Sequence, residues 1–181
     1  MFQARDNELQ VLLWQRAREP DPGAWALPGG YLEPGETYEL RNGGDVTIAC
    51  TGTALREATA AADLLAGEGI DATLLHFATV KPFDADVLTA AAARTGAVVT
   101  VEEHSIVGGF GSAAAEALAE AGVGATLRRM GLPDTFAHAV GSRDYLVDRY
   151  GLSGPAVADA ARGLLERSPA WQTRDPQVGN V

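Results

Sequence analysis

Along residues 45–130 the spacing of apolar residues changes repeatedly between that of a strand and that of a helix. This alternation constrains the fold more than any other feature of the chain. Short apolar runs, typical of buried strands, alternate four times with segments whose apolar residues recur at helical spacing. Such alternation with short connections favours a parallel sheet with right-handed crossovers and helices on both faces. The sequence therefore predicts an α/β domain with three layers, α/β/α.

The apolar runs and the helix signals also give bounds for the individual elements. Strands are expected over the ranges Asp45–Cys50, Ala72–Ala78, Ala97–Val101 and Ala125–Met130. Thr53 is expected to cap a first helix that ends at Gly67, and a second helix is expected to open at Asp84 and close at Gly96. Three more helices are expected over Ser112–Ala121, from Ser142 to Gly151, and from Pro155 to Arg167.

Charge and cysteine content narrow the choice of partners and compartment. Fourteen Lys and Arg residues against twenty-four Asp and Glu residues give a formal net charge of −10, which repels phosphate backbones and anionic lipids. The single cysteine, Cys50, is expected to be a small buried hydrophobe in a strand, as in a reducing compartment. No run approaches the roughly 20 apolar residues that span a bilayer, and no signal-peptide pattern opens the chain. We therefore expect a cytoplasmic protein with neither a nucleic-acid nor a membrane partner.

The end of the third predicted strand carries the most distinctive acid–base side chains. Glu102, Glu103 and His104 could transfer protons or hold a metal, and chemistry in open α/β sheets gathers at the carboxyl ends of strands. The structural alternative is that adjacent side chains of a strand point in different directions and form no common site. The sequence leaves both interpretations open.

Three glycines follow, where the next helix is expected to begin. Gly108, Gly109 and Gly111 would let backbone amides approach an anion at the helix N-terminus, where the helix dipole favours negative charge. The same glycines would equally serve a tight turn. A binding module for an anionic ligand at Gly108–Ser112 is thus one candidate function.

Five motifs in one order resemble a known family. They are Gly44–Ile48 with Thr51–Gly52, Leu65–Ile70, Thr79–Asp84, Val101–His104 with Gly108–Gly111, and Met130–Asp134. Together they resemble the C-terminal domain of transketolases, which is shared with deoxyxylulose-phosphate synthases and the beta subunits of 2-oxo acid dehydrogenases. The resemblance implies a five-stranded, mixed but mostly parallel sheet whose first strand, Tyr38–Arg41, runs antiparallel to the rest.

The resemblance also implies where the chemistry of such an enzyme lies. In this family the domain supports the dimer and a neighbouring pyrimidine-binding domain, while thiamine diphosphate and its divalent cation lie between the other two domains. The sequence shows neither of those domains, so we carry over no catalytic, cofactor-binding or metal residue. Thiamine diphosphate and magnesium are expected only in a complete enzyme with partner domains. The landmarks of a loop or interface site are carried over: Glu103, His104, Gly108, Gly109 and Gly111.

The N-terminal residues resemble a different family. Val11–Arg16 and the Trp-x-Leu-Pro-Gly-Gly turn, with the spacing from Gly30 to Glu36, are similar to the opening of a Nudix hydrolase. That resemblance implies a following helix whose carboxylates hold magnesium, but the residues after Glu36 read as a turn with two glycines. We expect a strand or loose packing over Leu9–Trp14, a loop over Pro20–Gly35, and no metal site.

The sequence thus predicts a truncated Nudix-like segment over residues 1–36, a transketolase C-terminal-like domain over 37–167 and a flexible tail over 168–181. The leading hypothesis is a structural, dimer-supporting domain or subunit of a thiamine-diphosphate-dependent enzyme, inactive as an isolated chain. We expect it to form a homo-oligomer or to bind a catalytic subunit that carries the cofactor-binding domains. The enzymatic alternative is a Nudix-type nucleoside diphosphate hydrolase.

Overall fold

The described residues of the N-terminal unit form short antiparallel strand pairs. The computed structural model describes residues 2–5, 8–11, 14–15, 25–26, 37–136 and 138–167, and it divides the chain into two compact units, Met1–Glu33 and Pro34–Val181. In the first unit β1 (Phe2–Arg5) pairs with β2 (Glu8–Val11), and β3 (Trp14–Gln15) pairs with β4 (Trp25–Ala26). The stretch expected to be a loop therefore contains the short strand β4. The remainder of that loop and the tail 168–181 lie outside the described residues.

The second unit is built on a five-stranded sheet. Its strands are β5 (Thr37–Arg41), β6 (Val46–Thr51), β7 (Ala72–Phe77), β8 (Ala97–Ser105) and β9 (Thr126–Leu132), in the order β5-β7-β6-β8-β9. β5 runs antiparallel to β7, and all other neighbours are parallel. The predicted mixed, mostly parallel sheet and its antiparallel first strand are confirmed.

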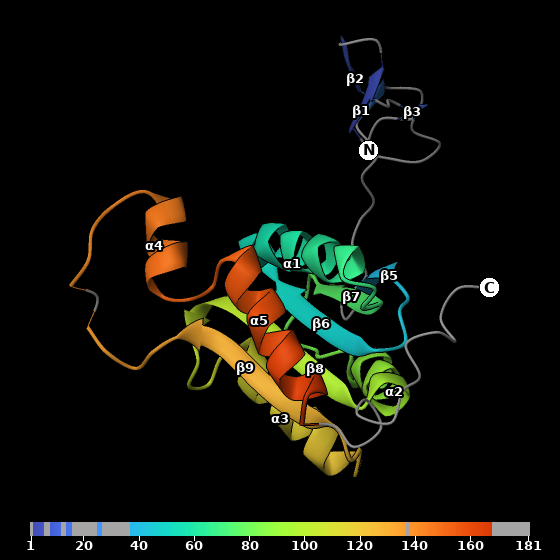
Figure 1. Cartoon of the computed structure of the whole chain (residues 1–181), viewed down its shortest axis with the longest axis vertical. Coiled ribbons are helices and arrows are strands. Elements are labelled where there is room, and N and C mark those ends of the chain that lie inside the picture. The colour runs from blue at the N-terminus through green and yellow to red at the C-terminus, as the bar shows by residue number, and fades with distance from the viewer. Residues whose placement is uncertain are drawn as a thin grey trace. The chain divides into compact units, whose positions relative to one another are not determined.

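Helices cover both faces of this sheet (Figure 1). A single 3₁₀ turn, η1 (Gly52–Ala54), leads into α1 (Leu55–Gly67). α1 and α5 (Gly154–Leu165) pack on one face, and α2 (Ala85–Thr95) and α3 (Phe110–Glu120) pack on the other. The short helix α4 (Arg143–Arg149) follows a long connection from β9. The three layers predicted from the sequence are therefore present.

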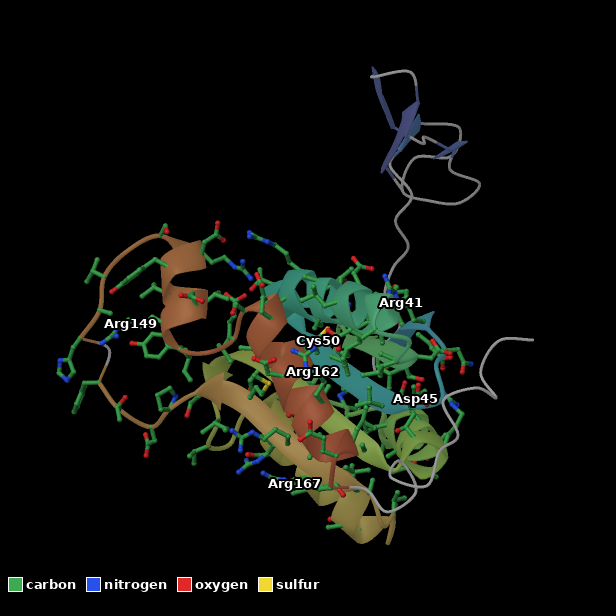
Figure 2. The ribbon with its side chains drawn as sticks, viewed as in Figure 1. Arg41, Asp45, Cys50, Arg149, Arg162 and Arg167 are labelled. Atoms are coloured by element: carbon green, nitrogen blue, oxygen red, sulfur yellow. The ribbon has the colours of Figure 1, made fainter. Side chains whose placement is uncertain are left out.

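Apolar residues on alternate positions of the central strands fill two cores. Ile48, Leu74 and Val99 face α1 and α5, whereas Leu75 and Phe77 face α2 and α3. Burying one such side chain stabilises the fold by about 1.5–3 kcal/mol, so two filled faces give the sheet a substantial core. Cys50 belongs to the first core and is fully buried, as predicted (Figure 2).

Local chemistry sets the ends of the helices. The Asp84 carboxylate accepts a bond from the Val87 amide at 3.4 Å and caps α2, and Gly96 closes that helix in the left-handed conformation (φ 68°), as predicted. The predicted cap at Thr53 is wrong: Thr53 lies within η1, which adds a tight turn before α1 begins. Within the described part of the chain, no helix has the length and apolar character needed to cross a membrane.

Candidate functional site

Glu102 lies at the carboxyl end of β8 and bonds to the start of α3. Its side chain is 1% exposed, and its two oxygens accept bonds from the amides of Phe110 at 2.7 Å and Gly111 at 2.8 Å. Those amides are among the first of a helix and have no partner within it. A carboxylate there is further stabilised by the helix dipole. The Glu102 carboxylate therefore takes the place that an external anion would have at the N-terminus of α3.

Two glycines allow this approach. A Cβ atom on Gly109 would clash with the Glu102 carboxylate and the Ser105 carbonyl, and one on Gly111 would lie 2.8 Å from Thr100 Oγ1. Gly108 has φ 71°, a conformation that residues with a side chain rarely adopt. Of the three glycines expected to let an external anion approach, Gly109 and Gly111 lie at the Glu102 carboxylate instead. The anion-binding module is not supported, because the amides of Phe110 and Gly111 already have an acceptor.

Glu103 points to a different partner from Glu102. It forms an ion pair with Arg143, the first residue of α4, whose guanidinium also reaches Glu57 Oε1 at 3.1 Å and the Thr53 carbonyl at 3.2 Å. The hydrogen bond that Arg143 donates to Glu103, with weaker contributions from Glu57, raises the pKa of Arg143 above its ordinary value despite partial desolvation. One arginine thus joins α4 to α1 and to the end of β8.

Glu57 repeats the arrangement found at Glu102. It is 8% exposed, and its second oxygen accepts a bond from the Gly154 amide, at the start of α5, at 3.1 Å. Two buried glutamates therefore cap two helix N-termini on opposite faces of the sheet. The sequence-based interpretation missed both Glu57 and Arg143, which lie 86 residues apart.

His104 does not join these acidic groups. Its side chain is exposed, and its Nδ1 lies 3.4 Å from the Ser105 carbonyl oxygen. Although Glu102, Glu103 and His104 are adjacent in sequence, their side chains lie in three different environments. This is the alternative in which adjacent side chains of a strand form no common site. Among the described residues no group of three or more His, Cys, Asp or Glu side chains is placed to hold a metal ion.

Arg129 stabilises the turn that contains these residues. Its guanidinium donates to the Ile106 carbonyl and to Ser112 Oγ, both at 3.0 Å, and the Ile106 amide donates to the Leu132 carbonyl at 2.9 Å. The turn after β8 is therefore fastened to β9 and to α3.

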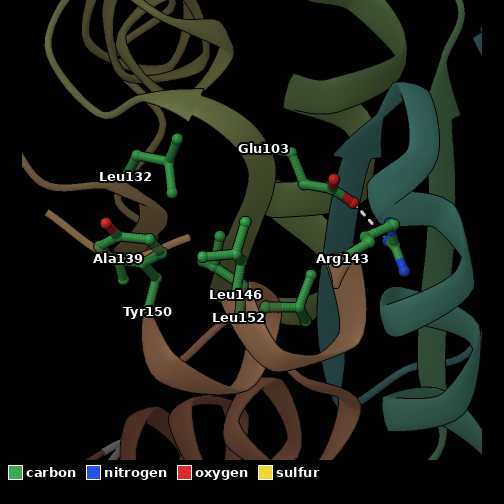
Figure 3. Close-up of a pocket in the computed structure, with 8 residues that line it drawn as sticks. Glu103, Leu132, Ala139, Arg143, Leu146, Tyr150 and Leu152 are labelled. Atoms are coloured by element: carbon green, nitrogen blue, oxygen red, sulfur yellow. Dashed lines mark hydrogen bonds and ion pairs between the residues drawn. The ribbon is translucent and has the colours of Figure 1, made fainter. Parts of the chain in front are cut away.

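A pocket of about 400 Å³ lies between the end of β9 and α4 (Figure 3). The Glu103–Arg143 pair forms its polar side. Its other lining residues are apolar or aromatic: Leu132, Ala139, Leu146, Val147, Tyr150 and Leu152. Of the predicted site residues, the pocket includes Glu103 alone, and its lining favours an apolar occupant.

Two family models match the chain. The model described as "Transketolase, C-terminal domain" matches residues 35–157. The model described as "NUDIX domain" matches residues 1–40. The first match covers the sheet and most of its helices, whereas the second ends within β5.

Two curated relatives are similar to most of this chain. The 6-deoxy-6-sulfo-D-fructose transketolase subunit SqwH of Clostridium sp. (strain MSTE9) is 48% identical over 133 residues, which are 74% of this chain and 41% of the relative. The 1-deoxy-D-xylulose-5-phosphate synthase of Symbiobacterium thermophilum is 40% identical over 174 residues, or 90% of this chain and 27% of that enzyme. The chain thus spans less than half the length of these relatives.

Solved structures agree with the fold. A structure titled "Split gene transketolase, inactive beta4 tetramer" is 39% identical, with a TM-score of 0.70 over 75% of this chain and 44% of that chain. The transketolase from Leishmania mexicana, at 22% identity and a TM-score of 0.55, shares the fold over 74% of this chain.

Proposed function

The chain belongs to the transketolase C-terminal domain family, and on that premise we propose that it is a supporting subunit of a thiamine-diphosphate-dependent enzyme. Its cofactor-binding domains come from another chain, and this chain has no activity alone. The substrate of that enzyme is a sugar or a 2-oxo acid. Like the beta4 tetramer it resembles, the chain also associates with copies of itself.

The strongest support for this proposal is the way in which the acidic residues at the carboxyl edge of the sheet are used. Thiamine diphosphate needs a Mg²⁺ ion held by oxygen ligands against its diphosphate. Glu102 instead accepts two backbone amides, and Glu103 pairs with Arg143. These residues fit a structural role and do not fit the cofactor, so we derive no catalytic step from them.

The proposal is tested by a ketol-transfer assay. The purified full-length chain is supplied with thiamine diphosphate, Mg²⁺, a ketose phosphate donor and an aldose phosphate acceptor, beside a complete transketolase as positive control. We expect product from the control and none from the chain. Cofactor-dependent product that increases with the concentration of the chain would contradict the proposal.

The Nudix alternative is not favoured, although a family model matches residues 1–40. A Nudix site requires a magnesium-binding helix after Glu36, and Thr37–Arg41 instead forms strand β5, which pairs with β7. We therefore expect no magnesium-dependent hydrolysis of a nucleoside diphosphate derivative by the full-length chain. Release of phosphate or nucleotide that requires Mg²⁺ and the protein would restore this alternative.

A further inference from the structure

The connection between β9 and α4 carries two strongly exposed apolar side chains. Phe136 is 89% exposed and Val140 is 95% exposed. Scattered apolar residues are common on protein surfaces, but a protruding aromatic beside an apolar recess is typical of an interaction site. Here the recess is the pocket of about 400 Å³, and it lies at the same connection.

The pocket and the protruding ring belong to one short stretch of chain. Leu132 and Ala139, which lie on either side of Phe136 in the sequence, both line the pocket. Leu146, Val147 and Leu152 form further apolar lining, so that an aromatic ring would find carbon atoms around it. The volume is within the range of sites that hold small organic groups.

A surface with both a protruding ring and an apolar recess can bind a copy of itself. In an association with two-fold symmetry, each protomer presents the same patch, so a side chain given to the partner is matched by one received from it. We propose that Phe136 of one copy inserts into the pocket beside α4 of a second copy, and that the second copy does the same in return. This inference rests on the self-association included in the proposed function, and it names the surface responsible.

Charge affects the strength of this association. Each chain has a formal net charge of −10, so two copies repel one another. An apolar anchor counteracts this repulsion, and salt screens it. Self-association through Phe136 should therefore strengthen between ~0.05 M and ~0.5 M NaCl, the opposite of an interface held by ion pairs.

Cross-linking tests the insertion directly. Cys50 is buried, so a cysteine introduced on the surface is the one that reacts. Full-length Phe136→Cys and Tyr150→Cys variants, one of them tagged, are mixed and oxidised. We expect a mixed disulfide dimer, because Phe136 lies against Tyr150 of the other copy. Phe136→Cys mixed with Leu64→Cys is the control, since Leu64 is 45% exposed on α1 and lines no part of the pocket.

A mixed dimer no more abundant than in the control would overturn the inference. An intramolecular disulfide in a monomeric Phe136→Cys/Tyr150→Cys double variant would also overturn it, because Phe136 would then fill the pocket of its own chain. Neither result bears on the ketol-transfer test, so the inference and the inactivity of the isolated chain can fail separately.

Sedimentation equilibrium gives a second measure. Phe136→Asp should raise the dissociation constant of the oligomer at least about tenfold, the effect of removing an aromatic anchor, while Leu64→Asp leaves it unchanged. Phe136 is exposed in the protomer, so its replacement should leave the fold intact. An oligomer equally stable in both variants would leave self-association standing and refute this surface, whereas a monomer at every concentration would refute both.

Discussion

Two buried glutamates cap helices. Glu102 binds the start of α3 and Glu57 binds the start of α5. A buried charge is tolerated when hydrogen bonds satisfy it, and the positive end of a helix dipole adds to that compensation. Each carboxylate thereby fixes where a helix leaves the carboxyl edge of the sheet.

Replacing Glu102 by Gln tests this role. The amide removes the charge and keeps a single acceptor oxygen for two backbone amides, so the free energy of unfolding should fall by about 1.5–3 kcal/mol. Urea denaturation followed by circular dichroism measures it. Glu116→Gln, at an exposed position of α3, is the matched control and should change stability by less than about 0.5 kcal/mol. Equal stability of the two variants would show that Glu102 does not hold the helix.

The buried thiol of Cys50 predicts a loss of stability at alkaline pH. Burial raises the pKa of this thiol from 9.0 to about 12. Above pH 9 the unfolded chain therefore releases a proton that the folded chain keeps, so rising pH favours unfolding. Relative to Cys50→Ala, the wild-type protein should lose up to about 1.4 kcal/mol of unfolding free energy per pH unit above that point.

Denaturation curves of both proteins between pH 8 and pH ~10.5 provide the measurement, since other titrating groups cancel in the difference. Below the ordinary pKa of the thiol, the difference between the two proteins should be constant. A difference that stays constant across the whole range would mean that the thiol titrates alike in both states.

Arg143 contributes to the attachment of the short helix α4. Arg143 links it to Glu57 of α1 and to Glu103 of β8. Its side chain is 32% exposed, so solvent weakens these ion pairs. Arg143→Met should therefore lower global stability by no more than about 1 kcal/mol but increase amide hydrogen exchange in α4 and at the start of α5. Arg149→Met, at the other end of α4, should leave exchange near the wild-type rate, and equal exchange in the two variants would exclude the proposed anchor.

The order and type of the main elements from β6 onward could be predicted because hydrophobic period and glycine position agree with one another, whereas β5 was expected from the family resemblance alone. The bounds of the elements near the site could not be predicted in this way. The strand expected to end at Val101 continues to Ser105, and the helix expected to begin at Ser112 begins at Phe110. Both shifts place Glu102 against the amides of Phe110 and Gly111, a contact that local propensity does not encode.

The site was predictable only in part for the same reason. The turn with its glycines was found from sequence because unusual residues cluster there. The partner of Glu103 is Arg143, which is 40 residues away and reaches it only through the packing of α4. Sequence spacing gives no register between such distant residues, so the ion pair and the pocket beside it needed the structure.

The whole chain joins two unlike sequences. Its first 40 residues match the NUDIX model, and residues 35–157 match the transketolase C-terminal domain model. The residues in common lie around the start of β5, and from there the chain follows the second family. The function we propose follows from that family, and from the structural contacts that engage Glu102 and Glu103 at the carboxyl edge of the sheet.

The most direct test of this account is a calorimetric titration of thiamine diphosphate, with Mg²⁺ present, into the full-length chain. Protein-bound cofactor would require a metal site, and among the described residues no group of three or more His, Cys, Asp or Glu side chains is placed to hold a metal ion. We predict no heat beyond that of dilution. Saturable binding at one equivalent, with a micromolar or tighter dissociation constant, would show that this polypeptide holds the cofactor by itself and would contradict the account.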